Sequence, residues 1–436
     1  MKNRKECAII DKNKNRTGFT MNKILKRSLA AMLCLSALTL TACGGKSDTG
    51  NGSGTSESAG VDYSTLVDFT VEVETGRDIR VLQITDTQLI DCTQKREGDN
   101  VSGMYQPNKT EEFCYRYIRQ AVERYDPDLI IHTGDIIYGR FDDNGSMLQE
   151  YVAFMETLDT PWAPVFGNHD NESKMGVDWQ CQQFVEAENC LFKQRNLTGN
   201  GNYTVGLVQG DELKRVFFML DSNGVASMSA ESAANGHTQK EVGFAMDQIS
   251  WYVDSARAIK RESPNTKLSF AFHIQIAAFE YAFAQYTDYY GALSAGHDSG
   301  KVNLDDNADA IAAGDFGYIG ATAKGAWDYS YAVFDEFVEL GVDSVFVGHE
   351  HENSASIEIS GVRLQFGQKS SQYDRFNKVM NGGKVENNKV IGGKIVGSDT
   401  HEGIPLMGGT KITICEKDGT IGGDTSLLLW EENWGK

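Results

Sequence analysis

Two histidines, His349 and His351, stand two positions apart directly after the apolar run 345–347, which is typical of a buried strand. A neutral imidazole is among the commonest protein ligands of transition metals. Side chains at the end of a strand converge easily with those of neighbouring strands. The pair therefore indicates a candidate metal site at this strand end.

Four other apolar runs end in polar side chains of similar chemistry. These runs cover residues 79–84, 129–131, 164–166 and 268–272. The polar residues that follow them are Asp86, Gln88, Asp135, Asn168, His169, Asp170 and His273. Carboxylate, imidazole and carboxamide groups together suit divalent and trivalent transition metals. Because the carboxyl ends of parallel strands meet at one edge of an α/β sheet, the pattern predicts a metal site at that edge.

Each of these residues also has an ordinary explanation when it is taken alone. Asp86 and Asp170 could be turn or cap residues. Asn168 could hold a turn, and His273 could be a buried histidine with satisfied hydrogen bonds. The metal site is favoured because polar residues of this kind follow five strand-like runs, which no single structural role explains.

The elements that would position these residues alternate along the chain. Strands are predicted over 67–71, 79–85, 128–133, 164–166, 215–220, 268–272 and 344–347. Helices are predicted over 108–125, 148–158, 244–259 and 331–340, and a hairpin over 356–359 and 362–366. This alternation is typical of a layered α/β fold with crossover helices. Residues 274–330 interrupt it and are interpreted as an insertion, either a substrate lid or a surface excursion without function.

The ordered series of motifs resembles the calcineurin-like metallophosphoesterase superfamily. The motifs are Asp86-Thr87-Gln88, Gly134-Asp135, Gly167-Asn168-His169-Asp170, His273 and Gly348-His349-Glu350-His351. The resemblance implies an α/β fold, in which a two-sheet sandwich is flanked by helices and a dimetal site lies at the carboxyl ends of the strands. It also implies metal-dependent hydrolysis of a phosphoester by a metal-bound hydroxide, with two ions drawn from Mn, Fe, Zn and Co.

The resemblance implies a role for each motif residue. The metal-binding residues would be Asp86, Gln88, Asp135, Asn168, His273, His349 and His351. Asp135 would bridge the two ions, and Asp86 and His351 would bind the first. Asn168, His273 and His349 would bind the second. The catalytic residue would be His169, placed near the transferred phosphoryl group or the leaving group.

One position departs from the superfamily's pattern. The first motif usually contains Asp-x-His, whereas this chain has Gln88, whose neutral carboxamide is a weaker ligand than imidazole. Tyr138 follows Asp135 at a spacing that resembles the GDxxY motif of purple acid phosphatases, in which a tyrosinate binds Fe(III). Two interpretations stay open: Tyr138 is a metal ligand, or it packs beside the strand end.

The N-terminal region resembles a bacterial lipoprotein signal. Basic residues precede the mostly apolar stretch 29–40, which is too short to span a bilayer comfortably. The stretch leads to Leu40-Thr41-Ala42-Cys43, so residues 1–42 are predicted to be removed and Cys43 to be lipidated. The protein would then be extracytoplasmic and anchored to the bacterial cell membrane. An ordinary signal peptide cut near Ala42 is the alternative, and residues 1–20 could be an upstream extension.

Composition sets limits on the remaining chain. Residues 43–65 are rich in Gly and Ser and are interpreted as a flexible tether, followed by the catalytic domain over 66–436. The formal net charge of −20 argues against a nucleic-acid-binding surface, which needs clustered Lys and Arg. Cys181 and Cys190 are close enough in sequence to pair across a loop. A second functional class also stays open, a lipoprotein that binds a phosphorylated ligand without turnover in transport or sensing.

Overall fold

The computed structural model describes residues 62–99, 110–224, 243–295, 300–320, 330–397 and 402–431. Cys43 and the predicted signal segment lie outside these residues, as does the predicted tether up to residue 61. Among the described residues, no helix combines the length and apolar character needed to cross a bilayer.

The first of two large sheets has five strands in the order β19-β18-β2-β3-β4. Its parallel members are β2 (Ile79–Ile84), β3 (Leu129–His132) and β4 (Trp162–Pro164). β18 (Gly408–Ile414) and β19 (Ser426–Leu429) close the other edge in antiparallel pairing. The three parallel strands are short and almost wholly buried, which explains why they read as continuous apolar runs.

The second large sheet has seven strands in the order β1-β5-β6-β7-β10-β12-β11. They are β1 (Phe69–Val73), β5 (Tyr203–Gln209), β6 (Glu212–Met219), β7 (Lys267–Ala271), β10 (Val342–Val347), β12 (Val362–Phe366) and β11 (Ser356–Ile359). The central run β6, β7, β10 and β12 is parallel. Parallel neighbours bring their carboxyl ends to one edge, as the predicted site requires.

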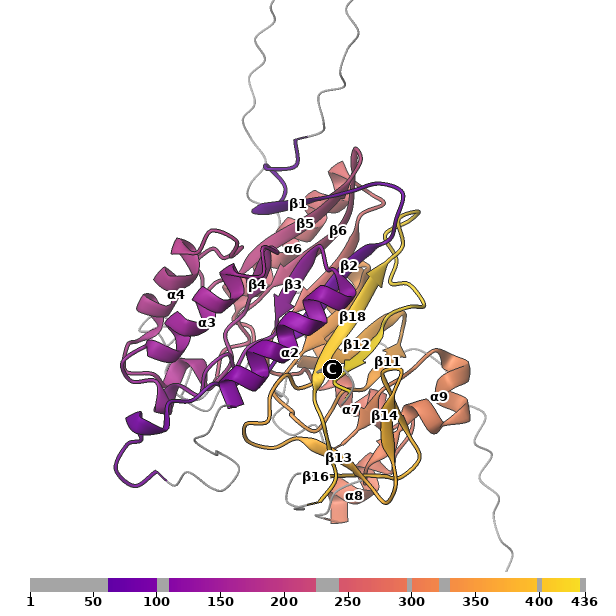
Figure 1. Cartoon of the computed structure of the whole chain (residues 1–436). Coiled ribbons are helices and arrows are strands. Elements are labelled where there is room, and N and C mark those ends of the chain that lie inside the picture. The colour runs from indigo at the N-terminus through magenta and orange to yellow at the C-terminus, as the bar shows by residue number, and fades with distance from the viewer. Residues whose placement is uncertain are drawn as a thin grey trace, which may run out of the picture. The chain divides into compact units, whose positions relative to one another are not determined.

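Helices flank the sheets. α2 (Thr110–Tyr125), α3 (Ser146–Glu156) and α4 (Val177–Glu186) pack with the five-stranded sheet, and Figure 1 shows α2 lying along β2 and β3. α6 (Met246–Glu262), α7 (Ala278–Phe283) and α10 (Ser330–Leu340) pack with the seven-stranded sheet. The buried face of α2 carries Cys114, Tyr117, Ile118 and Ala121 at helical spacing, which is why this segment forms an amphipathic helix.

Alternating side chains of the seven-stranded sheet enter two different cores. Phe217 and Phe346 join the cluster that also holds the residues of β2 and β3, so they face the other sheet. Their neighbours Phe218 and Val345 join the cluster formed with α6 and α10. The sheet therefore lies between two cores, and the predicted two-sheet sandwich flanked by helices is confirmed.

The predicted insertion contains short elements of its own. Within residues 274–330 the structure describes α7, α8 (Tyr289–Ala295), β8 (Val302–Asn303), η4 (Leu304–Asp306), α9 (Ala308–Ala313) and β9 (Tyr318–Ile319). A small sheet follows the hairpin, with β16 (Lys394–Gly397), β13 (Asn377–Met380) and β17 (Ile404–Leu406) in that order. The remaining elements are the pair β14 (Lys384–Glu386) and β15 (Lys389–Ile391), and the 3-10 turns η1 (Cys92–Gln94), η2 (Gly139–Phe141) and η3 (Asp170–Glu172).

Several local predictions need correction. The strand predicted over 67–71 is β1, Phe69–Val73, and the helix predicted over 148–158 is α3, Ser146–Glu156. The strand predicted over 164–166 is β4, Trp162–Pro164, because the chain pairs from Trp162 onward and leaves the ladder soon after Pro164. Cys181 and Cys190 do not form a disulfide, and both are buried free thiols. The Cys181 thiol instead lies 3.4 Å from Gln194 Oε1. By contrast, the predicted hairpin coincides with β11 and β12 to the residue.

Candidate metal centre

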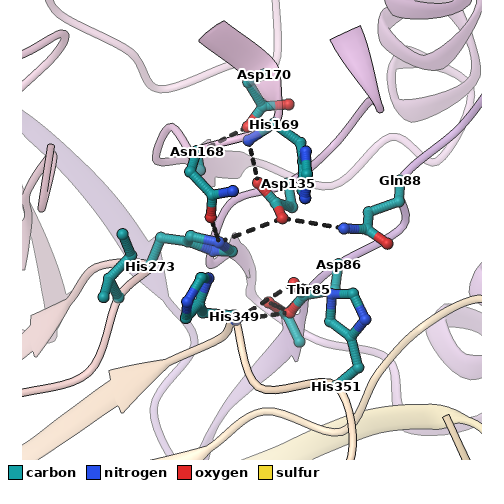
Figure 2. A network of polar contacts seen from close by, with 12 residues as sticks. Thr85, Asp86, Gln88, Asp135, Asn168, His169, Asp170, His273, His349 and His351 are labelled. Carbon is teal, nitrogen blue, oxygen red and sulfur yellow. Dashed lines mark hydrogen bonds and ion pairs between the residues drawn. The ribbon is translucent and has the colours of Figure 1, made fainter. Parts of the chain in front are cut away.

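The carboxyl ends of strands from both sheets meet, and the loops that leave them carry the predicted site residues (Figure 2). β2 and β3 of the five-stranded sheet lead to Asp86 and Asp135, and β7 and β10 of the other sheet lead to His273 and His349. The backbone N–H of Asp86 donates to the carbonyl oxygen of Gly134 at 3.0 Å. The loop after β2 is thereby tied to the loop after β3.

The structure brings all eight predicted side chains of the centre into one cluster. They are Asp86, Gln88, Asp135, Asn168, His169, His273, His349 and His351. Most of the cluster is shielded from solvent, and Asp86, Gln88, Asp135 and His273 are fully buried. Burying so many polar groups together is costly unless they are paired or bind an ion.

One part of the cluster is built around Asp86 and His351. Asp86, Asp135 and His351 each offer a ligand atom, and these atoms lie within 4.8 Å of one another. His351 Nε2 lies 3.3 Å from Asp86 Oδ1, while its Nδ1 lies 3.4 Å from the carboxylate of Asp374. Asp374 thus holds the outer nitrogen of the ring and directs the inner one towards the two carboxylates.

A second part is built around His273. Its Nδ1 lies 2.8 Å from the carbonyl oxygen of Thr133, which can only accept a hydrogen bond, so Nδ1 carries a proton. Its Nε2 faces two acceptors, Asp135 Oδ2 at 3.3 Å and Asn168 Oδ1 at 3.2 Å, and it would give up its proton on binding a metal. The ring of His349 packs nearby, with its centroid 5.1 Å from that of His273. Asp135 therefore belongs to both parts.

The cluster strongly shifts the pKa values of its members. Burial would raise the pKa of Asp86 and of Asp135, but the neighbouring histidines outweigh it and hold both pKa values below their ordinary range. Burial alone would lower the pKa of His273, but the Asp135 carboxylate raises it to about 9. Burial and the charge of His273 lower the pKa of His349 to about 3, which keeps this ring neutral and able to bind a metal.

His169 lies beside these groups. Its backbone N–H donates to Asp135 Oδ1 at 2.9 Å, and its Nδ1 lies 3.1 Å from Glu172 Oε2. Burial lowers its pKa, but the charges of Asp135 and Glu172 outweigh this and the net shift is upward. The ring of Tyr138 stacks on that of His169 at 4.0 Å between centroids, so Tyr138 has a packing role against the predicted catalytic side chain. Burial raises the pKa of Tyr138 to about 12.

Asp170, the last residue of the GNHD motif, serves the backbone. Its carboxylate accepts hydrogen bonds from the N–H groups of Ile137 at 2.9 Å and Gly167 at 2.7 Å. It thus joins the loop after β3 to the loop after β4. This is the turn-holding role that sequence reasoning left open for Asp170.

The family assignment follows from the same motifs. A sequence profile of the calcineurin-like phosphoesterase family matches residues 79–353, which contain every residue of the cluster. The chain belongs to the calcineurin-like phosphoesterase family. Membership implies a divalent metal centre, and the clustered carboxylates and imidazoles fit such a centre.

Several characterised or named proteins are similar to this family member. "Probable inactive purple acid phosphatase 29" of Arabidopsis thaliana is 23% identical over 313 residues, 66% of this chain and 71% of the relative. A protein of Arcobacter nitrofigilis named as a probable glycerophosphodiester phosphodiesterase is 32% identical over 114 residues, 26% of this chain and 37% of the relative. A dimetal phosphatase structure from Danio rerio aligns with a TM-score of 0.43 and 13% identity, over 68% of this chain and 89% of that one.

Sequence reasoning missed three charged residues that touch the cluster, of which Glu172 pairs with His169 as described above. Lys369 is buried, and its Nζ lies 2.9 Å from the carbonyl oxygen of Asp86 and 3.3 Å from Gln88 Oε1. Asp374 pairs with His351 as described above. A signal for Lys369 was present, because it stands three residues beyond the end of β12, a strand that neighbours β10 and runs parallel to it.

Glycines in three of the motifs stand where side chains cannot fit. A Cβ atom on Gly167 would lie 2.1 Å from Asp135 Oδ1, and one on Gly348 would lie 2.2 Å from Thr85 Oγ1. A Cβ atom on Gly134 would lie 2.6 Å from His273 Nδ1. Each glycine therefore lets a loop approach a residue carried by another strand.

Gly167→Ala is expected to displace Asp135, because the added methyl group overlaps its carboxylate and its backbone nitrogen. Overpacking of this kind destabilises a protein by about 1–3 kcal/mol. Urea unfolding followed by circular dichroism measures the change. Gly423→Ala is the matched control, because nothing lies within 4 Å of a Cβ atom there. Equal stability of the two variants would contradict the crowding described here.

Proposed function

We propose that this chain is a metal-dependent phosphoester hydrolase with a dinuclear centre. The observation that carries the proposal is the division of the ligand atoms into two groups that share Asp135. Asp86 Oδ1 and His351 Nε2 lie 3.3 Å apart on one side, and His273 Nε2 and Asn168 Oδ1 lie 3.2 Å apart on the other. Atoms at such separations can face one ion without moving far.

The first ion would be held by Asp86 and His351, and the second by Asn168, His273 and His349, with Asp135 between them. When bound, two such ions lower the pKa of a water molecule and neutralise charge on a phosphoryl group. The chain's own contribution is to keep each ligand in its binding form. The hydrogen bond from Nδ1 of His273 to Thr133, the contact of His351 Nδ1 with Asp374 and the low pKa of His349 support this.

His169 would act on the substrate. Its ring is about one-fifth exposed, and Glu172 holds its Nδ1, which leaves Nε2 for the substrate. The Asp135 and Glu172 carboxylates favour its protonated form. It would hydrogen-bond the phosphoryl group or donate a proton to the leaving oxygen, as a general acid does.

Asp135→Asn and His349→Ala are each expected to lower kcat by about 10³-fold or more, because each removes a ligand from the proposed centre. The assay is hydrolysis of p-nitrophenyl phosphate and bis(p-nitrophenyl) phosphate after loading with Mn, Fe, Zn or Co. Asp254→Asn, at an exposed position on α6, is the matched control and should retain activity.

The competing function is that of a lipoprotein that binds a phosphorylated ligand without turnover. It predicts binding of the phosphoester without hydrolysis in the same samples. The word "inactive" in the name of the Arabidopsis relative makes this comparison important. Calorimetric binding of a phosphoester with no hydrolysis under any of the four metals would establish the competitor. Undiminished hydrolysis by Asp135→Asn would refute the dinuclear mechanism.

His169→Ala is expected to affect substrates unequally. General acid catalysis contributes about 10²–10⁴-fold when the leaving group is poor. We expect a loss of about 10²-fold or more with an alkyl phosphate such as 2-glycerophosphate, and a much smaller loss with p-nitrophenyl phosphate. Steady-state kinetics of both substrates measure the ratio. Equal losses would indicate that His169 binds the phosphoryl group and does not protonate the leaving oxygen.

We also propose that the protein is an extracytoplasmic lipoprotein attached to the bacterial cell membrane through Cys43. The signal-like sequence before Cys43 and the Gly/Ser-rich segment after it support this. Cys43→Ser is expected to move the protein from the membrane fraction to a soluble fraction and to abolish labelling by a fatty acid. A mature N-terminus without lipid would instead indicate the ordinary signal peptide.

A further inference from the structure

The side-chain amide of Gln88 is fixed at both ends. Its Nε2 lies 3.1 Å from Asp135 Oδ2, and its Oε1 lies 3.3 Å from Lys369 Nζ. The ammonium group of Lys369 can only donate, so the amide oxygen must face it and the amide nitrogen faces the Asp135 carboxylate. All three side chains are at most 1% exposed, so water does not compete for these contacts.

Lys369 is itself held firmly in place. Its Nζ donates to the carbonyl oxygen of Asp86 at 2.9 Å. Its neighbour Ser370 donates its backbone N–H to Thr85 at 3.0 Å, and Gly408 donates its backbone N–H to the carbonyl oxygen of Lys369 at 2.8 Å. The segment after β12 is therefore bound to the loop after β2 on one side and to β18 on the other. The main chain at Lys369 is therefore fixed, and the hydrogen bonds of Nζ to Asp86 and Gln88 hold its side chain.

This arrangement treats the two proposed metal positions differently. On the Asp86 side, the carboxamide oxygen of Gln88 could have joined the carboxylates, but it is already bound by Lys369. Asp86, Asp135 and His351 are left as ligands there. The other side keeps Asp135, Asn168, His273 and His349. The amino group of Lys369 also lies against Asp86 and would repel a divalent cation near it.

We propose that Lys369 removes Gln88 from the ligand set and thereby makes the ion on the Asp86 side the weaker and more readily exchanged of the two. Gln88 then acts as a positioning residue, which orients Asp135 through its amide nitrogen. This inference rests on the proposed dinuclear centre. Its consequence is that activity follows the free metal concentration over the range in which the weaker position fills.

The test measures Mn²⁺ binding by equilibrium dialysis with elemental analysis. The wild-type protein should bind one ion tightly and a second with a dissociation constant at least about tenfold higher, a difference of about 1.4 kcal/mol. Lys369→Met removes both the repulsion and the hydrogen bond to Gln88. It should lower the dissociation constant of the weaker ion by about tenfold and leave that of the tighter ion unchanged. Lys369→Arg keeps the charge and should resemble the wild type.

Lys260→Met is the matched control. Lys260 is also partly buried and donates to a backbone carbonyl, that of Thr266 at 2.6 Å. Thr266 precedes β7, whereas His273 follows it, so Lys260 lies at the opposite end of the sheet from the site. Its removal should leave both constants unchanged. Gln88→His offers an imidazole in place of the amide and serves as a second measurement if Lys369→Met folds poorly. It should also lower the dissociation constant of the weaker ion.

Two results would overturn the inference. One is that Lys369→Met, folded by circular dichroism, leaves both constants within about twofold of the wild type. The other is that Gln88→Ala loosens the weaker ion by more than about tenfold and leaves the tighter ion unchanged, which would identify Gln88 as a ligand of the weaker ion. Hydrolysis assays on the same samples separate this inference from the proposed function. If the two Mn²⁺ dissociation constants differ and respond to Lys369→Met, but no substrate is hydrolysed, the proposed function is rejected and the inference about Lys369 stands.

Discussion

Two buried carboxylates, those of Asp86 and Asp135, are the constraint around which the site is built. Ionised groups are costly to bury, especially two of the same sign in a chain that is already acidic. The fold compensates each of them with donors. Asp86 accepts from the hydroxyl of Thr85 at 2.7 Å and from the N–H of His349 at about 3.1 Å. Asp135 accepts from the N–H of His169 and the amide of Gln88. The same donors fix the directions in which the remaining oxygen lone pairs can reach an ion.

The backbone is strained at several residues of the cluster. Asp86, Gln88, Asp135 and His349 all adopt positive φ angles, between 43° and 74°. Residues other than glycine adopt this region infrequently, and each costs of order 1 kcal/mol or more when held there. These residues follow the ends of β2, β3 and β10 by two to four positions, and their side chains join the cluster. Backbone strain is thus concentrated where the ligands are.

The sequence predicted which side chains would cluster because its signal is local. Each of them follows an apolar run within a few residues, and parallel strands gather such positions at one edge. Lys369 and Asp374 were missed because they act through long-range contacts with Asp86, Gln88 and His351. The place of Lys369 shortly after β12 puts it at the right edge of the sheet, but nothing near either residue in sequence identifies its partners. The pairing of Cys181 with Cys190 failed for a related reason, since closeness in sequence does not set the direction of a thiol on a helix. The short β4 was misplaced because Pro164 obscures where its ladder ends.

The crowding around Gly134, Gly167 and Gly348 has an evolutionary consequence. Each of these positions faces a residue from a different part of the chain, so no side chain can enter one of them unless a distant segment moves as well. Single substitutions of these three glycines are therefore disfavoured, although the glycines themselves have no side chain that could take part in the reaction. Surface positions carry no such constraint, because a substitution there requires no second change elsewhere. The three glycines are thus constrained by packing, independently of the chemistry of the side chains that they adjoin.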